Sequence, residues 1–207
     1  MSRKSLLTLA CLTGAGYLAL ALIASQAHVY AFEHGTRALV AATRGPFLDR
    51  PMQAASVLGD EWGLVPLIAM GTAALWTRHR RWASALPLIM LGTGALQWLA
   101  KWSVDRPRPN LLPLGFPSGH VLSAVVLFGL AAYWLCRARS ERFARGMGVG
   151  AGAGLIGLVA SSRLYLEAHW FLDVVGGLLL GVTYLLLLIW VGETVEARAR
   201  GRRALSS

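Results

Sequence analysis

The sequence predicts an all-α, polytopic membrane protein that folds as a bundle of six transmembrane helices. Of its 207 residues, 56% are hydrophobic and 14% are charged, and the mean hydropathy is +0.54. A soluble domain of this size needs a more polar surface. The apolar residues are also gathered into blocks, and about 20 residues suffice for a helix to cross a bilayer. We therefore expect one membrane-embedded domain over residues 1–207, with no soluble domain attached.

Six apolar blocks mark the expected helices. Two of them, the second and the fifth, are short for a full crossing. Tryptophans fall near the block ends, as they do at membrane–water interfaces. The blocks are Leu6–Ala27, Trp62–Trp76, Ala83–Ala100, Ser118–Cys136, Met147–Ala160 and Phe171–Gly192.

The first block also resembles a secretory signal. Arg3 and Lys4 precede it, and the stretch Ala24–Ala27 offers small residues of the kind found at cleavage sites. Its length of roughly 20 residues exceeds the usual 7–15 of a signal core. We expect it to be retained as the first helix.

Residues 28–61 form the longest segment between apolar blocks. Gly45-Pro46 and Arg50-Pro51 interrupt it, and residues 29–43 could form a helix that lies in the membrane interface. Two interpretations stay open: a gate or ledge that admits a lipid sideways, or a solvated connector.

The fifth predicted helix carries glycines at four-residue spacing, at Gly146, Gly150 and Gly154, with Gly148, Gly152 and Gly157 between them. Small residues at this spacing lie on one face of a helix and let a neighbouring helix approach closely in lipid. We expect this stripe to be a packing surface.

Basic residues are distributed unevenly between the two sides of the predicted bundle. With the N-terminus inside, 13 of the 20 Lys and Arg residues fall in inner segments, among them a basic tail at about residues 193–207. Cytoplasmic loops are enriched in such residues. We therefore expect a multi-pass protein of the cytoplasmic (inner) membrane with both termini in the cytoplasm. The net charge of +10 then fits contact with anionic head groups, and we expect no nucleic-acid partner.

Three short polar segments lie at the edges of the apolar blocks, at residues 101–109, 117–120 and 162–173. The first two share the loop between the third and fourth predicted helices, and the third lies between the fifth and sixth. The topology places both loops on the same, extracytoplasmic side. These segments are the candidate site.

The cations of these segments suit a bound phosphate. Lys101, Arg108 and Arg163 match the charge of phosphoryl oxygens, and arginine can bind such oxygens bidentately. Two further residues are possible members of the site. Arg106 could touch the substrate or face lipid head groups, and Ser162 could donate a hydrogen bond to the phosphate or support Arg163.

The second segment predicts a helix N-terminus. Pro117 suits the first position of a helix, so Ser118, Gly119 and His120 would offer backbone N–H groups at its positive end, where anions bind readily. Gly119 would also let a phosphate come close to the backbone.

The third segment pairs a histidine with a carboxylate. His169 and Asp173 are four residues apart, so on one helix face they can form a hydrogen bond that fixes the imidazole tautomer. Asp, Glu and His residues show no metal-ligand spacing here, and we expect neither a metal nor another cofactor.

In their order and internal spacing, the three segments resemble the signature of the type 2 phosphatidic acid phosphatase family. The blocks are Lys-x6-Arg-Pro, Pro-Ser-Gly-His and Ser-Arg-x5-His-x3-Asp, and all three match without a departure. Vanadium haloperoxidases share this phosphate-site signature, but six membrane spans exclude a soluble haloperoxidase.

The resemblance also implies roles that the residues alone leave open. From residue chemistry, the two histidines are only expected on the same side of the membrane. The resemblance implies that His169 is the nucleophile and forms a phosphohistidine, with Asp173 orienting its ring. It implies that His120 is the general acid and base, and that the three cations with Ser118 and Gly119 bind the phosphate.

The function that the resemblance implies is a metal-independent, integral membrane lipid phosphatase. Its substrate would be a phosphate or diphosphate of the phosphatidic acid type or the undecaprenyl diphosphate type, held by its tail in the bilayer. A lipid phosphotransferase using the same intermediate and a non-catalytic lipid transporter or binding protein are the alternatives. We expect no obligatory protein partner.

Overall fold

The structure is a computed structural model that describes residues 2–77 and 79–205, and all regular secondary structure in this part of the chain is α-helical. The helices are α1 (Arg3–Ala24), α2 (Ala31–Ala41), α3 (Pro46–Val57), α4 (Glu61–Trp76), α5 (Arg80–Ser103), α6 (Gly119–Ala138), α7 (Arg142–Tyr165) and α8 (Phe171–Leu205).

The six predicted transmembrane helices correspond to α1, α4, α5, α6, α7 and α8. All but α4 have at least 18 residues and are apolar enough to cross a membrane. Helix α4 has 16 residues, which at 1.5 Å per residue span about 24 Å, and it carries no charge after Glu61. Helix α8 has 35 residues and is therefore longer than a bilayer is thick. From residue 193 to its end at Leu205, the predicted basic tail is part of this helix. The all-α, six-helix membrane bundle is confirmed.

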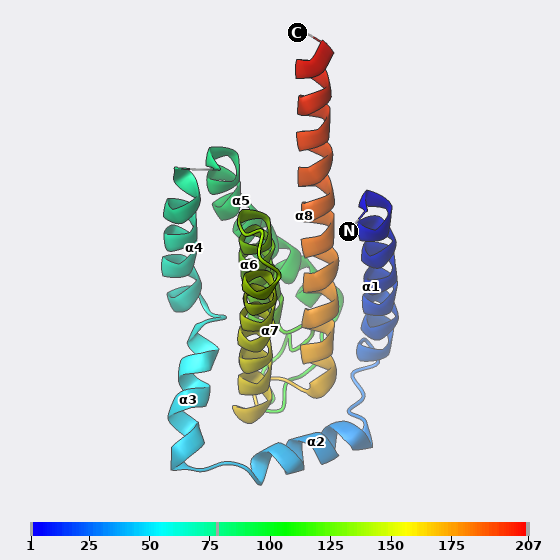
Figure 1. The fold of residues 1–207 in the computed structure, drawn as a ribbon. Helices are drawn as coiled ribbons and strands as arrows, with labels where there is room; N and C mark the ends of the chain where they lie inside the picture. The colour runs from blue at the N-terminus through cyan, green and yellow to red at the C-terminus, as the bar shows by residue number, and fades with distance from the viewer. Residues whose placement is uncertain (1, 78, 206–207) are drawn as a thin grey trace.

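The bundle is built around α6. This helix packs against α5, α7 and α8, while α1 lies along α8 and α4 along α5. More than half of the residues of α6 are buried, because it is apolar on all sides and surrounded by other helices. Figure 1 shows both termini at one end of the bundle and α2 crossing the other end.

Large apolar side chains cover the outer faces of the bundle. Leu12, Leu22, Met70 and Leu91 are all more than 60% exposed. A soluble monomer rarely exposes so much apolar surface, whereas lipid tails cover it without penalty. The outer surface is therefore the one expected of a membrane-embedded bundle.

The segment between α1 and α4 holds two helices. The predicted helix over residues 29–43 is α2, but α3 was not expected, because Pro46 and Pro51 appeared to interrupt the chain. Pro46 is the first residue of α3, where its missing N–H has no helical acceptor, and Pro51 lies inside the helix. The solvated-connector interpretation is wrong for part of this segment, since Glu33 is only 1% exposed and Ser56 only 8%.

Helix α7 packs through some of the expected glycines and not through others. A Cβ atom at Gly146, Gly150 or Gly154 would have no heavy atom within 4 Å. The close contacts are made by Gly148 against Leu135 and by Gly152 against the backbone of Phe128 and the Cβ atom of Ala132. Only one of the two glycine faces therefore packs against a neighbouring helix, because positions two residues apart are about 200° apart around a helix.

We predict that Gly152→Leu destabilises the bundle and that Gly150→Leu, on the same helix, does not. A Cβ atom at residue 152 would lie 3.2 Å from the Phe128 carbonyl oxygen and 3.3 Å from the Ala132 Cβ atom. A leucine there must separate α7 from α6, at about 1–3 kcal/mol. Thermal unfolding of the purified variants in detergent measures the difference. Equal midpoints would contradict this account of the packing.

Candidate active site

The three polar segments meet at the end of the bundle that α2 crosses. The Ser118 backbone N–H, just before α6, donates to the Asp173 carbonyl oxygen in α8, at 2.9 Å. The indole Nε1–H of Trp170 donates to the carbonyl oxygen of Pro107, at 3.1 Å. These bonds join the loop 104–118 to the loop 166–170 and to the first turn of α8, and so hold the polar segments together.

Within the described part of the chain, three cations of these segments have no carboxylate partner. Lys101 donates to the Leu114 carbonyl oxygen at 2.6 Å, and Arg163 donates to the hydroxyl of Ser56. In the part of the chain that the structure describes, neither of them, nor Arg108, forms a salt bridge. All three lie within electrostatic range of one another and of His120. The site is therefore a concentration of positive charge that the protein does not neutralise.

Unpaired donors gather in the same place. Across residues 2–77 and 79–205, five buried side-chain atoms lack a hydrogen-bond partner, and one is Thr72 Oγ1. The other four belong to the polar segments: Arg106 Nε, Arg108 Nε, Ser118 Oγ and Arg163 Nε. Buried polar atoms without partners are rare, and a cluster of donors matches a ligand rich in acceptors. A phosphoryl group is such a ligand.

His169 and Asp173 lie together, although not on one helix as expected. His169 is in the loop two residues before α8, and Asp173 is in the first turn of that helix. The Nδ1 atom of His169 is 3.4 Å from Oδ2 of Asp173. The same Oδ2 accepts the backbone N–H of Trp170 at 3.0 Å, which ties the carboxylate to the helix start.

Burial lowers the pKa of His169 to about 4, although its hydrogen bond to Asp173 and the charge of that carboxylate act to raise it. The residue is only 4% exposed, and the charges of Lys101 and Arg163 also lower the pKa. The imidazole is thus neutral at neutral pH. A neutral imidazole carries the lone pair that a nucleophile needs.

Arg106 is held by protein acceptors, and of its donor atoms Nε lacks a partner among the described residues. It is fully buried and so cannot face head groups. Its Nη1 atom donates to Asp173 Oδ1 at 3.0 Å, and its Nη2 atom donates to Glu33 Oε2 at 2.5 Å and to the His28 carbonyl oxygen. Because both Nη atoms of Arg106 already donate to these protein acceptors, they are not free to bind a phosphate. Burial favours a lower pKa, but the hydrogen bonds and charges of Glu33 and Asp173 outweigh it and raise the pKa of Arg106.

Ser162 also differs from expectation. Its hydroxyl donates to the carbonyl oxygen of Val159 in its own helix, at 2.7 Å, and the residue is fully buried. It therefore supports neither a phosphate nor Arg163. Ser56 of α3 holds that arginine instead.

The start of α6 is built differently from the prediction. The helix begins at Gly119 with Ser118 as its N-cap, so Pro117 lies before the cap. The Ser118 N–H is occupied by Asp173, which leaves its hydroxyl and the N–H groups of Gly119 and His120 as donors. A Cβ atom at residue 119 would lie 2.1–2.3 Å from the amide atoms of Gln97. The glycine thus makes room for Gln97 of α5.

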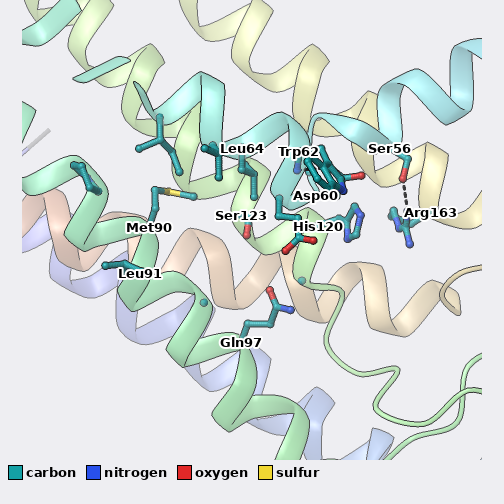
Figure 2. Close-up of a pocket in the computed structure, with 17 residues that line it drawn as sticks. Ser56, Asp60, Trp62, Leu64, Met90, Leu91, Gln97, His120, Ser123 and Arg163 are labelled. Carbon is teal, nitrogen blue, oxygen red and sulfur yellow. Dashed lines mark hydrogen bonds between the residues drawn. The ribbon is translucent and has the colours of Figure 1, made fainter. Parts of the chain in front are cut away.

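A cavity of about 940 Å³ leads from this site between α4 and α5. Figure 2 shows the His120 ring next to the Arg163 guanidinium near one end, with Met90 and Leu91 toward the other. The wall is mostly apolar, and its polar members besides these two are Ser56, Asp60, Glu61, Gln97 and Ser123. The cavity therefore has a polar end and an apolar end, as a lipid phosphate does.

No group of three His, Cys, Asp or Glu side chains within the described ranges lies close enough to hold a metal ion. Sequence reasoning missed Glu33, Ser56 and Gln97, which hold or contact site residues from α2, α3 and α5. Glu33 is the one acidic residue of α2, but nothing in the sequence pairs it with Arg106.

A helical membrane bundle with this site at one end is the architecture of a known class of membrane proteins. The chain belongs to this class, the PAP2 superfamily, whose family model matches residues 82–196. The chain is 30% identical over 192 residues to phosphatidylglycerophosphatase B of Bacillus subtilis (strain 168), covering 87% of this chain and 94% of that protein. It is 29% identical over 150 residues to lipid phosphate phosphatase delta of Arabidopsis thaliana, covering 64% of this chain and 36% of the plant protein.

Two solved structures share the fold. The crystal structure of a transmembrane PAP2 type phosphatidylglycerolphosphate phosphatase from Bacillus subtilis superposes with a TM-score of 0.78 at 25% identity, covering 90% of this chain and 96% of that one. Aquifex aeolicus LpxE superposes with a TM-score of 0.62 at 21% identity, covering 79% and 96%, and at this identity the likeness concerns the fold alone. The multi-pass membrane architecture is thereby confirmed.

We predict that acid destabilises the protein partly through His169. Its folded-state pKa of about 4 lies below the ordinary 6.5, so between these values the unfolded chain binds more protons. Stability is therefore full above about pH 6.5 and falls as the pH drops toward 4, by up to about 3 kcal/mol from this residue. Thermal unfolding from pH 7.5 to 4.5 should show a shallower decline for His169→Gln. His34→Gln, which removes an exposed imidazole, should keep the wild-type decline. Identical declines in all three proteins would contradict the pKa.

Proposed function

We propose that this membrane lipid phosphatase of the PAP2 type hydrolyses its substrate through a phosphohistidine on His169. The observation that carries the proposal is the set of three cations, Lys101, Arg108 and Arg163, which have no carboxylate partner among the described residues and lie within electrostatic range of one another and of His120. Arg163 and His120 also line the polar end of the apolar cavity. This set can hold a phosphate dianion while the lipid tail stays among the helices.

The first step is attack by His169. Its Nε2 lone pair forms a bond to phosphorus while the bond from phosphorus to the leaving oxygen breaks. Asp173 accepts a hydrogen bond from Nδ1–H, without taking the proton, and stabilises the positive charge that develops on the ring. His120 donates a proton to the leaving oxygen, which departs as the hydroxyl of the dephosphorylated lipid.

The second step is hydrolysis. His120, now neutral, takes a proton from a water molecule as the water oxygen attacks phosphorus. The bond between phosphorus and Nε2 breaks, inorganic phosphate is released, and His169 is neutral again. The same residues thus serve both halves of the reaction.

The cations stabilise the charge that spreads over the phosphoryl oxygens in both steps. A unit-charge contact at about 4 Å contributes roughly 4 kcal/mol at an effective dielectric constant near 20, before the desolvation of both groups is subtracted. Ser118 Oγ and the backbone N–H groups at the start of α6 add fixed donors. We propose that these groups do the work without a metal ion.

Phosphatidylglycerophosphate is the first substrate to test, because a relative named phosphatidylglycerophosphatase B matches nearly its whole length to this chain. Phosphatidic acid and undecaprenyl diphosphate belong in the same panel, since both carry a phosphate on a lipid tail. We place both termini in the cytoplasm and the site at the outer face of the inner membrane, because the positive-inside bias favours this orientation.

We predict phosphate release from this panel by the purified protein in detergent, with a chelator present. Activity should be unchanged, within about twofold, when EDTA replaces added Mg²⁺, and His169→Ala should lower it by at least about 1,000-fold because the nucleophile is lost. A colorimetric phosphate assay measures both. Activity that needs a divalent cation would contradict the metal-independent mechanism.

We predict that the phosphoenzyme can be trapped and is acid-labile, as a phosphorus–nitrogen bond is. With a ³²P-labelled aryl phosphate, whose leaving group needs no proton, His120→Ala should accumulate label because hydrolysis is slowed more than attack. The label should survive alkali, be lost in acid and be absent from His169→Ala. Label that persists in His169→Ala would assign the nucleophile elsewhere.

A further inference from the structure

A buried ion-pair cluster extends from the catalytic carboxylate Asp173, and the reaction above uses no other member of it. Its members are Glu33 of α2, Arg106 of the loop after α5 and Asp173 of α8. The side chains of all three are fully buried. Arg106 bridges the carboxylates, at 2.5 Å from Glu33 Oε2 and 3.0 Å from Asp173 Oδ1.

Both carboxylate oxygens of Glu33 accept hydrogen bonds from protein donors. Its Oε1 atom accepts from Arg106 Nη1 at 3.2 Å and from the Leu172 backbone N–H at 3.1 Å. Its Oε2 atom accepts from Arg106 Nη2 and from the Tyr30 backbone N–H, the latter at 3.2 Å. Each oxygen thus has two donors. A carboxylate held by four donors, two of them backbone groups, has one orientation.

The cluster continues into the catalytic pair. Arg106 holds Oδ1 of Asp173, and His169 Nδ1 lies at Oδ2 of the same carboxylate. Rotation of the Asp173 carboxylate would therefore break its bond to Arg106 and move Oδ2 away from His169. Arg106 itself is kept in place mainly by Glu33.

Stability alone is a weak reason for such a cluster. Desolvation of buried charges cancels most of their attraction, so apolar residues of the same volume would hold α2 equally well. Helix α2 is also docked independently, because Arg37 pairs with Glu167 of the loop before α8 at 3.0 Å. What apolar residues could not supply is a fixed orientation of Asp173.

We propose that Glu33 is a positioning residue of the phosphatase reaction, which acts by holding Arg106 and thereby the carboxylate that orients His169. The inference rests on the proposed function. Glu33 lies outside residues 82–196, the part matched by the family model. The role is therefore assigned by the contacts of α2 in this chain.

Glu33→Gln tests the role, because it removes the charge and keeps the shape. We expect kcat to fall about 10–100-fold, by analogy with the loss seen when hydrogen-bond partners that orient the ligands of a metal site are removed. KM and inhibition by vanadate should change less than about threefold, because Glu33 does not contact the phosphate site. Glu196→Gln is the matched control. It removes a glutamate paired with Arg137 at the other end of the bundle and should leave kcat and KM unchanged.

All rates are expressed per folded protein, measured by size-exclusion chromatography and thermal unfolding. A Glu33→Gln variant with a lower melting temperature but wild-type kcat overturns the inference, because Glu33 would then only hold α2. A raised KM with unchanged kcat also overturns it. If Glu33→Gln does not fold, Glu33→Asp is used as the test variant, because it keeps the charge but shortens the reach of the side chain to Arg106. We expect the same selective loss of kcat, and an unchanged kcat overturns the inference.

The wild type is assayed first, against the whole lipid panel. Absence of phosphate release there overturns the proposed function itself. Wild-type activity that is lost in His169→Ala but kept in Glu33→Gln overturns only the role of Glu33.

Discussion

The positive charge that the protein leaves unneutralised at one end of the bundle is the constraint on which the rest of the structure depends. Lys101, Arg108 and Arg163 have no carboxylate partner among the described residues, and two of them are at least nine-tenths buried. Buried like charges repel, and each also loses hydration, so the site opposes folding when it holds no anion. It persists because α5 and α7, which carry Lys101 and Arg163, and the loop that carries Arg108 are fixed by contacts elsewhere. The close approach of α7 to α6 through Gly152, and of α8 to α6 through Gly181, belongs to that packing.

Two arginines separated by one residue show how the fold assigns charge to different tasks. Arg106 has two carboxylates within 3.2 Å, and Arg108 has none. The difference comes from their neighbours, since α2 and α8 meet at Arg106. An arginine whose Nη atoms donate to two carboxylates is a structural cation, whereas an arginine with no carboxylate partner among the described residues is available to a ligand. The loop 104–118 therefore supplies both the support and the binding group.

The elements that could be predicted from the sequence are those whose signals lie within one short stretch of residues. Six apolar blocks predicted the bundle, and the polar segments at their ends predicted which loops carry the site. Contacts between distant segments could not be predicted. Glu33 and Arg106 are 73 residues apart, and Glu33 resembles any acid in the first turn of a helix. The fifth block offered two glycine stripes on opposite faces, and only the position of α6 decides which one packs. Gly119 was read as space for a phosphate because Gln97 gives no signal of its position.

The arrangement of the site also explains why a helix that lies across the end of the bundle accompanies the three motif segments. An imidazole that attacks phosphorus must keep one tautomer and one ring orientation, which a single hydrogen bond of 3.4 Å to Asp173 secures only if that carboxylate cannot rotate. In the interior of a membrane protein water is scarce, so the second oxygen of Asp173 needs a protein donor, and Arg106 is that donor. A buried arginine in turn needs more than one acceptor, and α8 offers it only Asp173. The additional carboxylate comes from α2, so the catalytic pair and the helix beneath it form one electrostatic unit.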